Sequence, residues 1–181
     1  CVTRRQRQMC IRDRLKRAKN SGFKTLIITA DIPASSRRER LRMAGVSVPP
    51  KNNLRTFFQA SICQMLSINT LINGIPAFGT MDQYSDGNWH GNAKSKAGFA
   101  GSQMQRYLDW DYLKEVRDIW KGPIILKGLM HLDDAIKAAK VVDAIYLSNH
   151  GGRQIDIAPS PLQILPEVRK KLGPKFPIIM D

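Results

Sequence analysis

The sequence has 181 residues, 43% of them hydrophobic and 24% charged, and its 29 Lys and Arg against 15 Asp and Glu give a net charge of +14. This composition is that of a globular protein, and it excludes disordered, collagen-like and membrane-spanning proteins. The length is sufficient for one domain with a good core. A complete (β/α)₈ barrel, however, usually needs about 250 residues.

The first residues look foreign to the sequence that follows. They contain no initiator Met and no apolar targeting segment, and residues 9–14 (MCIRDR) resemble translated sequencing-adapter DNA. We therefore predict that residues 1–10 are a non-native segment and leave them out of the fold. Beyond them the only cysteine is Cys63, so a disulfide framework and a cysteine zinc site are both excluded, and a reducing compartment is expected.

The rest of the chain alternates between helical patterns and short apolar runs. A basic helix is expected to end at Gly22. In the helix expected over residues 161–172, the spacing places four apolar residues on one face: Leu162, Leu165, Val168 and Leu172. Short β-branched runs that alternate with helices indicate a parallel sheet. The expected strands are residues 26–28, 123–126, 144–147 and 177–180, and the expected later helices are residues 111–120, 133–140 and 161–172.

Residues 43–105 interrupt this rhythm as a long insert. Within it, residues 54–66 have the apolar spacing of one amphipathic helix, and their polar residues exclude a transmembrane helix. The helix could pack on the protein or on a neighbouring subunit, or it could lie on a bilayer surface. Residues 79–105 read as loop, and an EF-hand-like start at Asp82 is rejected as a calcium site because position 12 is Ala93. No metal site is expected.

Each of the four apolar runs ends in a polar residue capable of chemistry. These residues are Thr29 and Asp31, Lys127, His150 and Asp181. In α/β folds with parallel strands, ligands bind at the carboxyl ends of the strands. A shared site explains four such endings better than chance does.

The string at residues 148–154 (SNHGGRQ) resembles the active-site signature of the FMN-dependent α-hydroxy-acid dehydrogenases and oxidases, and most of all their L-lactate dehydrogenase members. Residues 29–40, 120–128 and 180–181 resemble further phrases of that family in the same order. The resemblance implies an α/β fold: a partial (β/α)₈ barrel, roughly strands four to seven, with the insert after strand four. Residues 11–181 would then be a fragment of one barrel domain, with the FMN phosphate site outside it.

The resemblance also implies how the reaction would proceed. His150 would be the base that oxidises an L-2-hydroxy acid to the 2-oxo acid, and Asp31 would orient its imidazole and stabilise the imidazolium. Arg153 and Arg38 would bind the substrate carboxylate, because a planar guanidinium can donate two parallel hydrogen bonds to it.

The cofactor implied by the resemblance is FMN. Lys127 would stabilise negative charge on the reduced flavin, Thr29 would hydrogen-bond the ring system, and Asp181 would reach the ribityl chain. Electrons would pass from the flavin to a quinone or another acceptor. A homo-oligomeric cytoplasmic enzyme is expected. The insert resembles the segment with which membrane-associated members of the family contact the bilayer, so contact with the inner face of the cell membrane stays one of two alternatives for it.

Alternatives stay open at this point. Oxygen could be the acceptor, which would make the enzyme an oxidase of the same family. The charge of +14 also suits a nucleic-acid-binding α/β domain, although that function gives no reason for His, Lys and Asp to gather at strand ends. The 181-residue fragment by itself is expected to be inactive.

Overall fold

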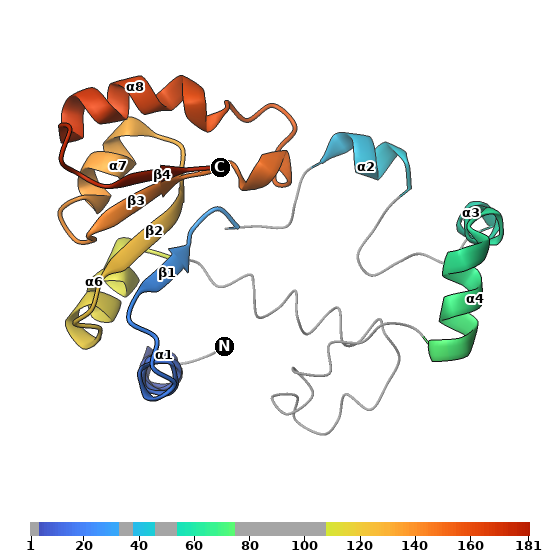
Figure 1. The fold of residues 1–181 in the computed structure, drawn as a ribbon, viewed down its shortest axis with the longest axis horizontal. Coiled ribbons are helices and arrows are strands. Elements are labelled where there is room, and N and C mark those ends of the chain that lie inside the picture. Colours follow the sequence, from blue (N-terminus) through green and yellow to red (C-terminus); the bar gives the residue numbers. More distant parts are fainter. Residues whose placement is uncertain (1–3, 33–37, 46–53, 75–107) are drawn as a thin grey trace. The chain divides into compact units, whose positions relative to one another are not determined.

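The computed structural model describes residues 4–32, 38–45, 54–74 and 108–181 (Figure 1). The chain divides into two compact units, one formed by residues 1–36 and 107–181 and the other by residues 37–106. The first unit contains the sheet and the second contains helices. Each unit is therefore described by itself.

The first unit is built on four parallel strands that follow one another in chain order across the sheet (Figure 1). This confirms the expected parallel sheet. The second strand is longer than expected, because Lys127 still pairs with its neighbours and the register shifts only between Lys127 and Leu129. The strands are β1 (Leu26–Thr29), β2 (Ile124–Leu129), β3 (Ala144–Leu147) and β4 (Ile178–Met180).

The helices of this unit lie close to the expected ranges, although the helix expected over residues 133–140 ends at Ala138. Gly22 has a φ of 81° just after the first helix, a conformation that favours glycine. The side chain of Asp109 accepts a hydrogen bond of 2.7 Å from the backbone N–H of Tyr112, and Nδ1 of His131 accepts one of 3.3 Å from Asp133. The helices are α1 (Arg4–Asn20), α6 (Trp110–Ile119), α7 (Leu132–Ala138) and α8 (Pro161–Leu172).

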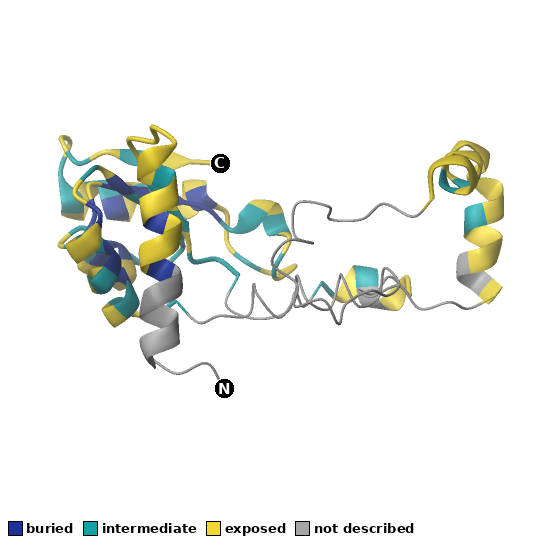
Figure 2. Ribbon diagram, turned by 90° about the horizontal axis from the view of Figure 1, so that it is seen from below, coloured by how far each residue is buried: buried dark blue, intermediate teal, exposed yellow. Residues whose placement is uncertain are grey.

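The core of the first unit lies between these helices and the sheet (Figure 2). On α8 the predicted face is wrong at one position: Leu162 is 64% exposed, while Pro161 and Val168 are buried. Leu165 and Leu172 are half-buried. Leu162 therefore lies outside the side of α8 that contacts the core. The largest fully buried side chains are Leu113, Val116, Ile124, Ile145, Leu147, Val168 and Ser148.

The second unit contains α2 (Glu39–Met43), α3 (Leu54–Ile62) and α4 (Gln64–Asn73). The prediction of a single helix over residues 54–66 is wrong, because Cys63, with a ψ of 69°, interrupts the helix and separates α3 from α4. The hydroxyl of Ser67 donates a hydrogen bond of 2.6 Å to the carbonyl of Ala60 across this break. The loop predicted at 79–105, with its rejected calcium motif, lies outside the described residues. Among the described helices, none is long and apolar enough to cross a membrane.

The amino ends of β2 and β3 are joined by one carboxylate. Oδ2 of Asp143 accepts hydrogen bonds from the backbone N–H of Ile124 at 2.8 Å and from the guanidinium of Arg117 at 2.7 Å. Arg117 also donates to the carbonyls of Trp120 and Gly122, at 2.8 and 2.7 Å. The Ile124 N–H and, more weakly, Arg117 lower the pKa of Asp143, although partial burial opposes them. The carboxylate therefore fixes how α6 and two strands meet.

Replacing this carboxylate should cost stability in a pH-dependent way. Because the folded pKa lies below the ordinary value of 3.8, the stabilisation is present above that value and is lost as the pH falls through the folded pKa. At neutral pH, Asp143→Asn should lower the free energy of unfolding by about 1 kcal/mol, since the group is half-exposed. Urea unfolding at several pH values measures this. The exposed Glu167→Gln is the control, and a difference between wild type and Asp143→Asn that persisted at low pH would contradict the prediction.

Candidate active site

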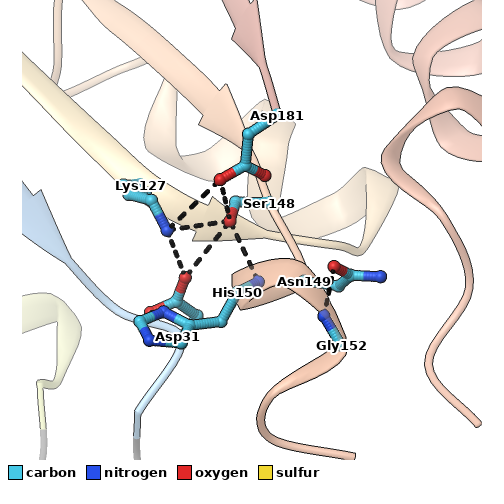
Figure 3. Close-up of polar contacts among 7 residues, drawn as sticks. All are labelled: Asp31, Lys127, Ser148, Asn149, His150, Gly152 and Asp181. Atoms are coloured by element: carbon cyan, nitrogen blue, oxygen red, sulfur yellow. Dashed lines mark hydrogen bonds and ion pairs between the residues drawn. The ribbon is translucent and has the colours of Figure 1, made fainter. Parts of the chain in front are cut away.

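Polar side chains from four strands meet at the carboxyl edge of the sheet (Figure 3). Lys127 lies within β2, and Asp31, Ser148 and Asp181 follow the ends of β1, β3 and β4. Because the strands are parallel and neighbours in chain order, their carboxyl ends lie side by side. The sheet therefore assembles a cluster from residues that are distant in the sequence.

The ammonium of Lys127 is the centre of this cluster. Its Nζ lies 2.8 Å from Oδ2 of Asp31, 2.8 Å from Oγ of Ser148 and 3.8 Å from Oδ2 of Asp181. The side chains of Lys127 and Asp31 are only 17% and 6% exposed. A charge pair with so little water needs good geometry and further hydrogen bonds, and Ser148 supplies one of them.

His150 begins a short 3₁₀ turn directly after this edge, His150–Gly152. Its φ is 59°, and it is followed by two glycines that also have positive φ values. Nδ1 of His150 lies 3.1 Å from Oδ1 of Asp31, close enough for an ion pair. The two buried atoms are not aligned for a hydrogen bond, and neither has another partner among the described residues. Catalytic hydrogen bonds commonly tighten only when substrate binds.

The turn that carries His150 is held by Asn149. Its Oδ1 accepts a hydrogen bond of 3.0 Å from the N–H of Gly152, and its Nδ2 donates one of 3.0 Å to the carbonyl of Pro159. These bonds close the turn and tie it to the segment before α8. The left-handed backbone at His150, rare for a residue with a side chain, is stabilised by this anchoring.

Gly128 allows β1 and β2 to approach each other at the site. A Cβ at this position would lie 2.5 Å from Cβ of Asp31 and 2.6 Å from its backbone nitrogen. The φ of Gly128 is 101°, a backbone conformation that residues other than glycine rarely adopt. Only glycine therefore lets Asp31 lie against β2, between Lys127 and His150.

The structure brings together four of the seven residues that the sequence proposes for the site: Asp31, Lys127, His150 and Asp181. Of the other three, Thr29 is exposed at the end of β1 and pairs in register with Lys127. Arg153 is exposed, and its backbone N–H donates a 3.1 Å hydrogen bond to the carbonyl of His150. Arg38 belongs to the second unit. The functional roles of all seven residues stay predictions.

Sequence reasoning missed three residues of this edge. Ser148 and Asn149 stand beside His150 in the motif and directly after a buried strand, so the rule that selected the other residues would have found them. Gly128 is likewise the direct neighbour of a residue that the sequence selected, Lys127. Its importance depends on the separation between two backbones, which no sequence pattern reports.

Comparison with known proteins identifies the family. The sequence profile of the FMN-dependent dehydrogenases matches residues 2–181. The chain belongs to the FMN-dependent dehydrogenase family. It is 33% identical over 178 residues to a putative L-lactate dehydrogenase of Mycobacterium tuberculosis, covering 98% of this chain and 40% of that protein. It is 35% identical over 173 residues to an L-lactate dehydrogenase of Pseudomonas entomophila, covering 94% and 45%.

Solved structures of this family share the fold. The crystal structure of a monotopic membrane protein, (S)-mandelate dehydrogenase, superposes with a TM-score of 0.77 at 26% identity, covering 99% of this chain and 46% of that one. A mandelate oxidase superposes with a TM-score of 0.61 at 21% identity, covering 96% and 40%. The expected fold class, part of a (β/α)₈ barrel, is confirmed. The chain spans less than half the length of these relatives.

The cofactor of the family is FMN, and the carboxyl edge of the sheet has groups that suit it. A flavin needs hydrogen-bond donors and a positive charge beside its ring, and acceptors for its hydroxylated chain. The hydroxyl of Thr29 and the ammonium of Lys127 come from paired positions on β1 and β2. The carboxylate of Asp181, 37% exposed, lies on the same edge. The donor set therefore fits FMN.

The close approach at Gly128 can be tested by stability. Gly128→Ala should combine backbone strain with a clash against Asp31, and we expect a loss of about 3 kcal/mol in the free energy of unfolding. Gly173→Ala is the matched control, because Gly173 has a φ of 79° but no atom within 4 Å of a built Cβ. That control should lose only about 1 kcal/mol. Equal losses in urea unfolding would contradict a clash with Asp31.

Proposed function

We propose that the chain is part of a longer FMN-dependent enzyme that oxidises an L-2-hydroxy acid, L-lactate, to the 2-oxo acid. The observation that carries this proposal is the pair formed by His150 and Asp31 beside the half-buried ammonium of Lys127. Such an oxidation requires a base next to a group that receives two electrons. The full-length protein that contains this chain is the object of the tests below.

His150 acts as the base. With Nδ1 facing the carboxylate of Asp31 at 3.1 Å, Nε2 is the nitrogen that takes a proton from the α-carbon or the hydroxyl of the substrate. Asp31 holds the ring in this orientation and stabilises the imidazolium that forms. Its second oxygen is engaged by Lys127 at 2.8 Å, which keeps the carboxylate from turning.

The remaining groups bind substrate and cofactor. Arg153, directly after the turn of His150, would bind the substrate carboxylate through two parallel hydrogen bonds, assisted by Arg38. Thr29, Lys127 and Asp181 would hold the flavin. FMN, when bound, accepts the two electrons that leave the substrate and passes them to a quinone or another acceptor.

L-Lactate is favoured over mandelate because the L-lactate dehydrogenases of M. tuberculosis and P. entomophila are 33% and 35% identical to this chain, whereas the (S)-mandelate dehydrogenase structure is 26% identical. Oxygen as the acceptor, in an oxidase of the same family, is the alternative. Anaerobic bleaching of the flavin by L-lactate, glycolate or (S)-mandelate identifies the substrate. The rate at which oxygen restores the absorbance separates a dehydrogenase from an oxidase.

Removal of the base should separate cofactor binding from chemistry. His150→Gln is expected to bind FMN normally and to lower the rate of flavin reduction by L-lactate about 10³-fold, within the usual range for a general base. Stopped-flow absorbance under anaerobic conditions measures this. His131→Gln changes an exposed histidine at the start of α7 and should reduce the flavin at the normal rate. Near-normal bleaching by His150→Gln would contradict the assignment.

We further propose that α3 and α4 contact a membrane surface. Nine large apolar side chains on these two helices are 51% to 89% exposed: Leu54, Phe57, Phe58, Ile62, Met65, Leu66, Ile68, Leu71 and Ile72. An exposed apolar surface of this kind marks a binding region, and the excess of positive charge favours anionic lipid. The similar (S)-mandelate dehydrogenase is described as a monotopic membrane protein.

Vesicle binding tests the membrane proposal. The full-length protein should sediment with vesicles that contain anionic phospholipid, and the double variant Phe57→Ser, Leu71→Ser should bind at least about tenfold more weakly, because it removes two exposed apolar anchors. Leu162→Ser, which changes a 64% exposed leucine of α8, is the control and should bind normally. Equal binding by all three proteins would favour packing of these helices on another subunit instead.

A further inference from the structure

We infer that Ser148 is a positioning residue that holds the cation and the base of the site in one arrangement. The inference rests on the proposed function, because it concerns how the same groups are kept in place. Ser148 is fully buried, with 0% of its surface exposed, at the end of β3. Among the residues that the structure describes, it is the only polar one that is buried over its whole surface, backbone included.

The hydroxyl of Ser148 uses its whole hydrogen-bonding capacity. A serine hydroxyl can accept two hydrogen bonds and donate one. Here it accepts from the ammonium of Lys127 at 2.8 Å and from the backbone N–H of His150 at 3.0 Å. Its own proton is left for a carboxylate, and Oδ2 of Asp181 at 3.1 Å is nearer than Oδ2 of Asp31 at 3.4 Å. One oxygen atom thus contacts polar groups that all four strands bring to the carboxyl edge of the sheet (Figure 3).

Without the hydroxyl, Nζ of Lys127 and the backbone N–H of His150 would both lose the oxygen that accepts their hydrogen bonds. The ammonium of Lys127 would keep the carboxylates of Asp31 at 2.8 Å and Asp181 at 3.8 Å and the ring of Tyr146, whose centroid is 5.5 Å away. It would lose its one neutral hydrogen-bond acceptor and could move between the two carboxylates. The half-buried N–H of His150 would lose its acceptor in a backbone with a φ of 59°, and the loss of this hydrogen bond would favour a different conformation of the turn. The cation and the imidazole would therefore shift together.

The test uses two variants of the full-length FMN-loaded protein. Ser148→Ala removes the hydroxyl, and Ser148→Cys keeps a side chain of similar shape that hydrogen-bonds only weakly. Both should lower the rate constant of flavin reduction about 10- to 100-fold, the effect of a small misplacement, with KM changed less than about threefold. Both should also lower the midpoint potential of the bound flavin, because a mobile ammonium stabilises the reduced form less. Ser160→Ala, at the exposed start of α8, is the control and should change neither quantity.

The possible outcomes distinguish this inference from the proposed function. If no 2-hydroxy acid reduces the wild-type flavin, the proposed function fails, while the midpoint potentials still report on the contact between Ser148 and Lys127. If the wild type is reduced and Ser148→Cys behaves like it in rate and potential, the serine only fills space and the inference is overturned alone. Variants that fail to fold or to retain FMN would overturn it as well, since they would assign Ser148 a structural role.

Discussion

The ammonium of Lys127 allows two carboxylates to approach each other at the carboxyl edge of the sheet. Asp31 and Asp181 come from the outermost strands of the sheet, and their Oδ2 atoms lie 2.8 and 3.8 Å from the same Nζ. Without this cation the two like charges would repel in a region with little water. With it, the formal charges of Asp31, Asp181 and Lys127 sum to −1. In the proposed reaction, a proton taken up by His150 would offset this charge.

The two edges of the sheet serve different purposes. At the amino edge, Asp143 and Arg117 satisfy backbone N–H and carbonyl groups of the loops and tie α6 to two strands. At the carboxyl edge, the charged side chains bond mainly to one another. This is the division found in barrel enzymes, in which one face stabilises the fold and the other carries the chemistry. Changes at the first edge should affect unfolding, whereas changes to the charged side chains at the second should affect the proposed reaction. Gly128, at the second edge, bears on stability because a Cβ there would clash with Asp31.

The sequence predicted the strands well because each is a short apolar run that a parallel sheet buries. Because these runs end in polar residues, it also predicted that Asp31, Lys127, His150 and Asp181 lie together, while their roles stay predictions. It failed where a feature depends on tertiary distance. The apolar spacing continues through Cys63, so periodicity could not reveal that α3 ends at Ile62. Nor could it reveal that Leu162 of α8 is exposed. A serine such as Ser148 is ordinary at the end of a strand, and only the geometry shows that its hydroxyl links Lys127 to His150.

The connection between the first two strands has a consequence for the order of folding. β2, β3 and β4 are joined by short helical crossovers, whereas β1 ends at Thr29 and its partner β2 begins only at Ile124. Closing so long a connection costs more chain entropy, and contacts of high sequence separation form late. Asp31 arrives with β1, so we expect its pair with His150 to be among the last native contacts made. Lys127, Ser148 and Asp181 would come together before it, and under the proposed function activity would appear only after β1 has docked.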